Sequence, residues 1–151
     1  MNLCNHILNR KILGSNTVDP FLLFIVLYPA LDNLTENKCR RIAMFNGYGS
    51  AEISYLFSLN AASPEEVIST MPNNSELNNI PANVDIAHRI ILAWGGYGKH
   101  QNRSAKVVNQ LKYQEEKLYV LGITKNGEPA HPLKIKYNTG LIKYDSRRTA
   151  K

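Results

Sequence analysis

Residues 90–98 read Ile-Ile-Leu-Ala-Trp-Gly-Gly-Tyr-Gly, and this stretch decides the fold class of the chain. Its unbroken apolar run predicts a strand that is covered on both faces, as in a parallel sheet. A helical pattern over 104–116 and a second apolar run over 118–122 follow. A strand, a helix and a second strand in this order predict two parallel strands joined by a helix.

The same alternation precedes this stretch. Residues 21–27 are continuously apolar and predict a central strand, and 53–59 predict another. Between them we expect a helix that is capped by Thr35 and stops at Asn46-Gly47. Ser63-Pro64-Glu65-Glu66 is a capping box at the start of a further helix. We therefore expect an α/β fold, a three-layer α/β/α sandwich with a short, mainly parallel four-stranded sheet.

The ends of the chain are less regular. Residues 7–13 predict an edge strand or a short helix, and 134–137 predict a short edge strand. We expect an N-terminal extension over 1–19, a single α/β domain over 20–142 and a basic, flexible tail over 143–151.

The charge of the chain is concentrated at its C-terminus. The formal net charge is +6, and residues 143–151 supply four positive charges and one negative charge, which is +3 of that total. The rest of the chain is only mildly basic, so charge alone does not require a nucleic-acid partner.

Cysteine usage and hydropathy exclude several classes of protein. Cys4 and Cys39 have no CxxC spacing, which argues against a structural zinc site and a disulfide scaffold. The apolar run over 21–31 contains Pro29 and is too short to predict a membrane helix, and the N-terminus lacks the features of a signal peptide. We expect a cytoplasmic protein without a membrane partner, a metal ion or a cofactor.

The carboxyl ends of parallel strands meet at one edge of a sheet, and ligands bind there. His131 is the leading candidate for catalysis, because an imidazole in a polar loop can donate to an oxygen or stabilise developing negative charge. The alternative is a surface histidine in a proline-containing turn. Asp32 could orient a water molecule or bind a ribose hydroxyl, or form a turn with Asn33.

Further ligand-binding candidates lie at the predicted strand ends. Tyr28 could stack on a base, and the glycine loop after Trp94 leaves backbone amides free for an anion, although it is neither a P-loop nor a dinucleotide fingerprint. The full set of ligand-binding candidates is Tyr28, Pro29, Asn33, Asn60, Trp94, Gly95, Gly96, Thr124 and Lys125. Arg40, Arg41, Lys99 and Arg103 could contact phosphates or simply solvate helix faces.

The order of these motifs resembles a known family. From the strand before Pro29, through Arg40-Arg41 and Ala93-Trp94-Gly95, to the block over 121–133, the chain is similar to the bacterial and phage proteins grouped as domain of unknown function 1643. The resemblance covers about residues 20–137, and the last block is its most specific part.

That family is in turn similar to a compact form of the uracil-DNA glycosylase superfamily. The resemblance implies a glycosylase-like fold in which Tyr28-Pro29 matches the motif that holds a water molecule and His131-Pro132 matches the motif that stabilises the departing base. The family usually has Asn-Pro-Ser-Thr-Ala-Asp at the first motif, whereas this chain has Tyr28-Pro29-Ala30-Leu31-Asp32-Asn33. Tyrosine cannot replace an amide or carboxylate that holds water, so Asp32 is the group that could substitute.

We therefore expect a domain that recognises a nucleotide or DNA in a groove at the carboxyl edge of the sheet. Base excision would use His131 as stabiliser and Asp32 to position water. If the protein is an enzyme, it is expected to be a DNA N-glycosylase or a nucleotide hydrolase. The alternative is a catalytically silent binding protein that sequesters a nucleotide signal or inhibits a protein partner. Such a protein could be encoded by a phage. The oligomeric state stays open.

Overall fold

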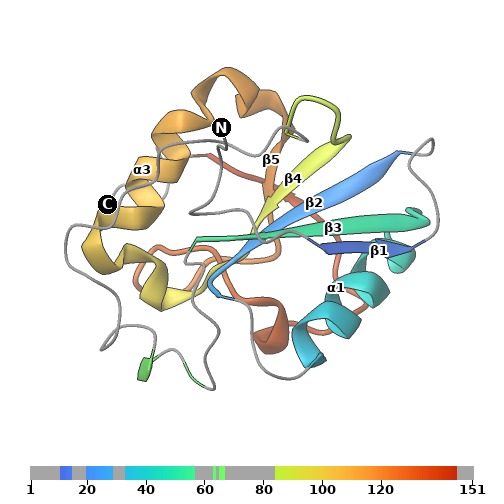
Figure 1. The fold of residues 1–151 in the computed structure, drawn as a ribbon, viewed down its shortest axis with the longest axis horizontal. Coiled ribbons are helices and arrows are strands. Elements are labelled where there is room, and N and C mark those ends of the chain that lie inside the picture. Colours follow the sequence, from blue (N-terminus) through green and yellow to red (C-terminus); the bar gives the residue numbers. More distant parts are fainter. Residues whose placement is uncertain are drawn as a thin grey trace.

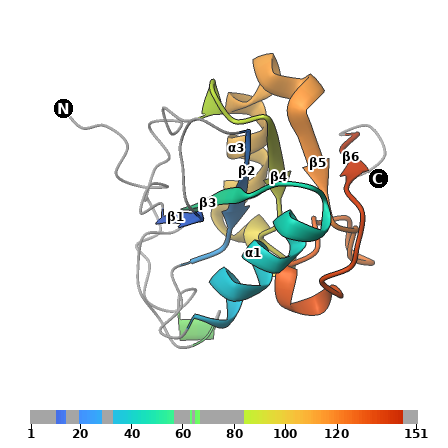
Figure 2. The ribbon, with the colours of Figure 1, turned by 90° about the vertical axis from the view of Figure 1, so that its right-hand side faces the viewer.

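The computed structural model describes residues 11–14, 20–28, 33–56, 63, 65–66 and 84–145. In this part of the chain six strands form one sheet with the order β1-β3-β2-β4-β5-β6. The strands are β1 (Lys11–Gly14), β2 (Phe21–Val26), β3 (Ser50–Tyr55), β4 (Arg89–Leu92), β5 (Leu118–Val120) and β6 (Ile142–Lys143). The four central strands run parallel, and β1 and β6 pair antiparallel at the two edges (Figures 1 and 2).

The α/β class predicted from the sequence is confirmed, but the sheet is mixed and has six strands rather than four. The two additional strands are short. β6 has only two residues, which is too few to show an alternating pattern in the sequence. β1 is the edge strand that residues 7–13 predicted as one alternative, and the residues before Lys11 lie outside the described part of the chain.

Among the described residues, one α-helix covers each face of the sheet. Helix α1 (Leu34–Phe45) lies on one side and α3 (Arg103–Gln110) on the other, as Figure 2 shows. In the described ranges, the 3-10 helix η2 (Gly96–Asn102) precedes α3 and η3 (Lys112–Lys117) follows it, while η4 (Pro132–Lys134) lies between β5 and β6.

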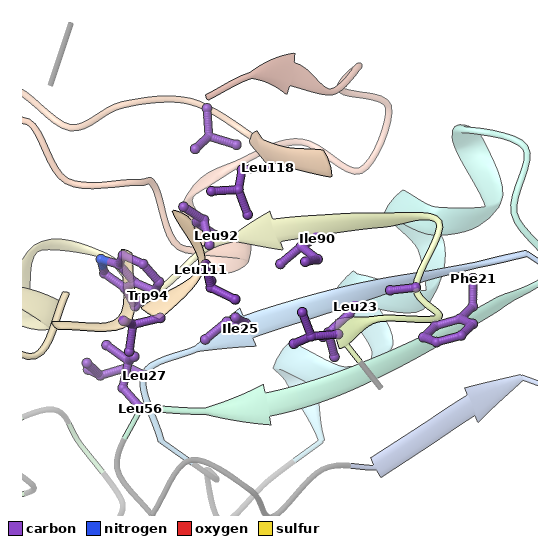
Figure 3. Packing of buried hydrophobic residues seen from close by; sticks show 14 residues of the cluster. Phe21, Leu23, Ile25, Leu27, Leu56, Ile90, Leu92, Trp94, Leu111 and Leu118 are labelled. Carbon is purple, nitrogen blue, oxygen red and sulfur yellow. The ribbon is translucent and has the colours of Figure 1, made fainter. Parts of the chain in front are cut away.

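Alternate residues of β2 enter two separate hydrophobic clusters. Leu23 and Ile25 pack with Leu111 on the side of α3, as Figure 3 shows. Phe24 points to the other face and belongs to the cluster that contains Ile42 of α1. Every residue of β2 is buried, which explains why its sequence is continuously apolar rather than alternating.

The first helix begins two positions earlier than predicted. Asn33, not Thr35, is the N-cap, because the carbonyl of Asn33 accepts the first helical hydrogen bond from the Asn37 amide at 3.0 Å. The predicted stop is confirmed: Asn46 is the C-cap, and Gly47 follows with φ +88°. Glycine adopts this left-handed conformation without steric cost.

The helical pattern predicted over 104–116 is interrupted in the structure. Asn102 has φ +60°, which separates η2 from α3, and Gln114 leaves the helical region inside η3. The regular α-helix is therefore shorter than predicted, because amphipathic spacing does not show where single residues leave helical geometry. At the capping box, the amide of Glu66 donates to Ser63 Oγ at 3.2 Å as predicted, and the helix that should follow lies outside the described residues.

The edge strand predicted at 134–137 is wrong. The chain instead turns through η4, where the Lys134 amide donates to the His131 carbonyl at 3.0 Å and the Ile135 amide to the Pro132 carbonyl at 3.2 Å. These local bonds occupy the groups that a strand would offer to a neighbour. The domain boundaries proposed from the sequence stay a prediction. No helix in the described ranges combines the length and the apolar character that a bilayer crossing requires.

Lys117 fixes the segment that leads into β4. Its ammonium donates to the carbonyls of Val84 at 2.8 Å, Ala87 at 2.9 Å and Asp85 at 3.2 Å. An ammonium has three donors, so these bonds satisfy it completely.

We expect Lys117→Met to lower the free energy of unfolding by about 1–3 kcal/mol, because the substitution leaves partly buried carbonyls without a partner. Urea denaturation followed by circular dichroism measures this. Lys112→Met is the control: Lys112 is exposed on the same 3-10 helix, and its loss should cost less than about 0.5 kcal/mol. Equal losses in the two variants would contradict this role for Lys117.

Candidate functional site at the carboxyl edge of the sheet

A pocket of about 880 Å³ opens where the parallel strands end. The chain leaves β2 toward β3 on one side and reaches β4 and β5 on the other, so β2 and β4 flank the point where the strand order reverses. Ligands of open α/β sheets bind at such points. The predicted site residues that the structure brings together here are Tyr28, Trp94, Gly95, Gly96, Lys99, Thr124 and His131.

The loop after β5 forms one wall of the pocket and is held by its own backbone. The Gly127 amide donates to the Thr124 carbonyl at 2.9 Å, and Gly127 has φ +88°, which confirms the tight turn predicted at Asn126-Gly127. The Thr124 amide donates to the Glu128 carbonyl at 2.7 Å, while the Glu128 amide donates to Thr124 Oγ1 at 3.1 Å. The turn therefore has little freedom, and Thr124 and Asn126 line the pocket from it.

Glu128 ties this loop to the rest of the fold. One carboxylate oxygen accepts from the indole Nε1–H of Trp94 at 2.8 Å, and the other accepts from the hydroxyl of Ser104 at 3.3 Å. Trp94 is only 1% exposed, so its indole donor needs a partner inside the protein. Glu128 thereby joins the end of β4, helix α3 and the loop after β5.

Two glycines let the chain pass close to Trp94 and His131. A Cβ at Gly98 would lie 2.0 Å from Cδ1 of Trp94, so the backbone of Gly98 packs directly on the indole. Gly95 has φ +80°, and its amide donates to the Pro129 carbonyl at 2.8 Å. A Cβ at Gly95 would lie 3.3 Å from Cβ of His131. The glycine loop thus serves close packing as well as access to the pocket.

His131 is held as a neutral hydrogen-bond donor. Burial, together with the positive charges of Lys134 and Lys38, lowers the pKa of its imidazole to about 4. Its Nδ1 accepts from the Leu133 amide at 3.2 Å. In a neutral ring with an accepting Nδ1, the proton resides on Nε2. Near pH 7, His131 therefore offers an Nε2–H to a ligand in the pocket.

The charges around the pocket favour an anion. Lys99 and Lys134 both line it, and Glu65 is the one carboxylate among the described residues that do so. Glu65 accepts a hydrogen bond from the hydroxyl of Tyr97 at 2.7 Å. This bond lowers the pKa of the Glu65 carboxyl and raises the pKa of the Tyr97 hydroxyl.

Five predicted site residues lie elsewhere. Asn33 caps α1, and Lys125 is exposed at the tip of the turn. Arg40 donates to Asn37 Oδ1 at 3.3 Å, and the guanidinium of Arg41 lies 4.0 Å from the centre of the Tyr137 ring. Arg103 is 0% exposed and donates to the Leu56 carbonyl at 3.4 Å, so it links α3 to the end of β3.

Pro29, Asp32 and Asn60 lie outside the described residues, so the water-positioning role of Asp32 stays a prediction. Across the described ranges, no group of three or more His, Cys, Asp or Glu side chains is arranged to hold a metal ion.

The structure adds residues that sequence reasoning had not assigned to the site. Lys134, Tyr97 and Glu65 line the pocket, and Glu128 supports it from behind. Tyr97 lies in the glycine loop and Lys134 follows the His-Pro segment, so proximity in sequence could have suggested both. Glu65 was interpreted only as part of a capping box, and nothing local links it to Tyr97.

One family model matches the chain. It spans residues 6–133 and is described as "Protein of unknown function (DUF1643)". Comparison with curated proteins and with solved structures gives no match.

We expect Gly98→Ala to lower the free energy of unfolding by about 1–3 kcal/mol, because the new methyl group would overlap the Trp94 indole and force it to shift. Thermal melting with indole fluorescence measures both the stability and the environment of the one tryptophan. Gly96→Ala is the matched control, since nothing lies within 4 Å of a Cβ at that position. Equal melting temperatures for the two variants would exclude the tight packing of Gly98 on Trp94.

The pKa of His131 predicts how stability depends on pH. The folded value is about 4 and the ordinary value is 6.5, so between these values the unfolded chain binds more protons than the folded chain. The contribution of His131 to the free energy of unfolding is therefore fully present above pH 6.5. It is lost as the pH falls toward 4, a change on the order of 2–3 kcal/mol. Urea titrations from pH 7 to 4 should show a shallower loss in His131→Asn, which keeps a side chain able to cap η4. Identical profiles for the two proteins would contradict a neutral, buried imidazole.

Proposed function

The chain belongs to the DUF1643 family of proteins of unknown function, and for this member we propose, from the geometry of its site, that it binds a nucleotide in the pocket at the carboxyl edge of the sheet. The observation that carries the proposal is the neutral Nε2–H donor of His131 in a pocket that two lysines also line. A nucleotide combines the groups that such a site recognises: carbonyl and ring acceptors on the base and negative charge on the phosphate.

The size and the walls of the pocket support this proposal. Small-molecule sites usually have volumes of about 300–1,000 Å³, and 880 Å³ lies within that range. Tyr28 and Tyr97 contribute aromatic rings, and Leu27, Ala130 and Leu133 contribute apolar surface. A planar base can stack or pack against such groups without a specific sequence requirement.

In this proposal, the ammonium groups of Lys99 and Lys134 bind the phosphate of the nucleotide. Lys99 follows the glycine loop and Lys134 follows His131 on η4, so the two ammonium groups reach the pocket from different elements. Ammonium groups bind phosphates as point charges and do not read the base. The lysines would therefore supply affinity and salt dependence, while the uncharged groups of the pocket would orient the base.

A second candidate is base excision by a protein with a uracil-DNA glycosylase-like fold, which the sequence resemblance implies. In that reaction the bond between the sugar and the base breaks and the electron pair stays on the base. Water adds its oxygen to the sugar carbon, and the proton that it loses ends on the base. The specific observation in its favour is again His131, because a neutral Nε2–H can stabilise the charge on the departing base. Asp32 would position the water.

We expect mononucleotides to raise the melting temperature of the purified protein by about 5–10 °C at about 100 times Kd, because a ligand of the folded state stabilises it by about 2.7 kcal/mol at that concentration. Lys99→Gln combined with Lys134→Gln should abolish most of the shift. The control is Lys106→Gln combined with Lys112→Gln, which removes the same charge from exposed positions outside the pocket.

The ligand panel separates the candidates. Cyclic dinucleotides and short single- and double-stranded DNA belong in the same screen at two salt concentrations. A salt-sensitive shift with DNA, with abasic product that disappears in His131→Ala, would identify base excision. A shift with a small nucleotide that is recovered intact would identify a binding protein that sequesters it. No shift with any of these ligands would overturn the nucleotide proposal and leave a protein partner as the alternative.

A further inference from the structure

Glu65 and Tyr97 form a polar pair on the pocket wall that nucleotide binding in general does not explain. They come from segments 32 positions apart in the chain, and the Tyr97 hydroxyl donates to Glu65 Oε2 at 2.7 Å. Both side chains line the pocket. A carboxylate is an unusual group beside a phosphate, because like charges repel, so its presence indicates a different part of the ligand.

The bonds within the protein do not saturate the Glu65 carboxylate. An ionised carboxylate accepts about four hydrogen bonds through its two oxygens. Tyr97 takes one of these positions on Oε2, and the Glu65 backbone and the Ser63 side chain also bond to the carboxylate, with smaller effects on its pKa. Because the bond from Tyr97 also lowers the pKa of the carboxyl, Glu65 is ionised and acts only as an acceptor at neutral pH. A carboxylate carries two parallel acceptor oxygens, and the bond from Tyr97 restricts their orientation at this exposed position.

Two parallel acceptors discriminate among the bases. Guanine carries N1–H and the N2 amino group side by side, so both carboxylate oxygens find a donor. Cytosine and adenine each place an acceptor beside their amino group, and uracil places carbonyls on both sides of N3–H. In each of these three bases an acceptor would face a carboxylate oxygen, which is repulsive. Only guanine among the common bases matches both oxygens.

We propose that the pocket selects guanine nucleotides and that Glu65 is the specificity-determining residue, held in place by Tyr97. This inference rests on the proposed nucleotide-binding function. The remaining groups of the pocket fit the rest of such a ligand. The Nε2–H of His131 is a donor for an acceptor on the base or the sugar, and Lys99 and Lys134 are available for the phosphate.

The test is isothermal titration calorimetry with GMP, AMP, CMP and UMP on four proteins: wild type, Glu65→Gln, Glu66→Gln and Tyr97→Phe. A bidentate contact to a base gives about 10- to 100-fold discrimination, so wild type should bind GMP at least about tenfold more tightly than the other three. Glu65→Gln should lose this preference to within about threefold, since an amide offers only one acceptor oxygen.

The other variants serve as controls. Glu66→Gln makes the same change at the adjacent exposed residue, which does not line the pocket, and should keep the preference. Tyr97→Phe keeps the carboxylate and should keep the preference for GMP at reduced affinity, because the orientation of Glu65 is lost. Glu65 is exposed, so circular dichroism should show all four proteins folded.

Each outcome has a distinct meaning. Equal affinity of wild type for the four nucleotides would overturn guanine selection and leave nucleotide binding intact. A preference for GMP that persists in Glu65→Gln would overturn the role of Glu65. Absence of binding by all four nucleotides and by their di- and triphosphates would overturn the inference together with the function on which it rests.

Discussion

The site depends on one partly buried interaction, the hydrogen bond from the Trp94 indole to the Glu128 carboxylate. Trp94 ends the run that follows β4, and Glu128 lies in the loop after β5, so the bond joins two crossover units at the carboxyl edge of the sheet. Ser104 binds the second carboxylate oxygen and adds α3 to the same junction. Because a buried indole donor or carboxylate without a partner is costly, this arrangement fixes the loop that carries His131.

The topology of the sheet explains why the pocket lies where it does. Strands β2 and β4 are neighbours, but their outgoing connections run to opposite sides, with α1 on one face and α3 on the other (Figures 1 and 2). The connections that leave these two strands therefore diverge, and a crevice that Tyr28 and Gly95 line remains between them. Helix η4 packs beside α1 and closes this crevice from the side of His131.

In the pocket, the groups that carry positive charge differ from the group that donates an uncharged hydrogen bond. Burial and the nearby lysines prevent His131 from becoming a cation near neutral pH, so it contributes a directional donor without charge. Lys99 and Lys134 contribute positive charge, and Glu65 contributes a pair of acceptors. The ligand that we propose, a nucleotide with an anionic phosphate and a base with paired donors, would satisfy these groups together.

The sequence by itself determined the features that depend on a few neighbouring residues. The apolar run of β2, the turn at Asn126-Gly127 and the candidate His131 were all visible, because burial pattern, turn conformation and side-chain chemistry are local properties. Only the tertiary structure decided the features that depend on contacts between distant segments. It placed Arg103 in the interior, paired β6 with β5, and joined Glu65 to Tyr97 across 32 positions. The physical reason is that such contacts follow from how the elements pack, which residue spacing along one element does not encode.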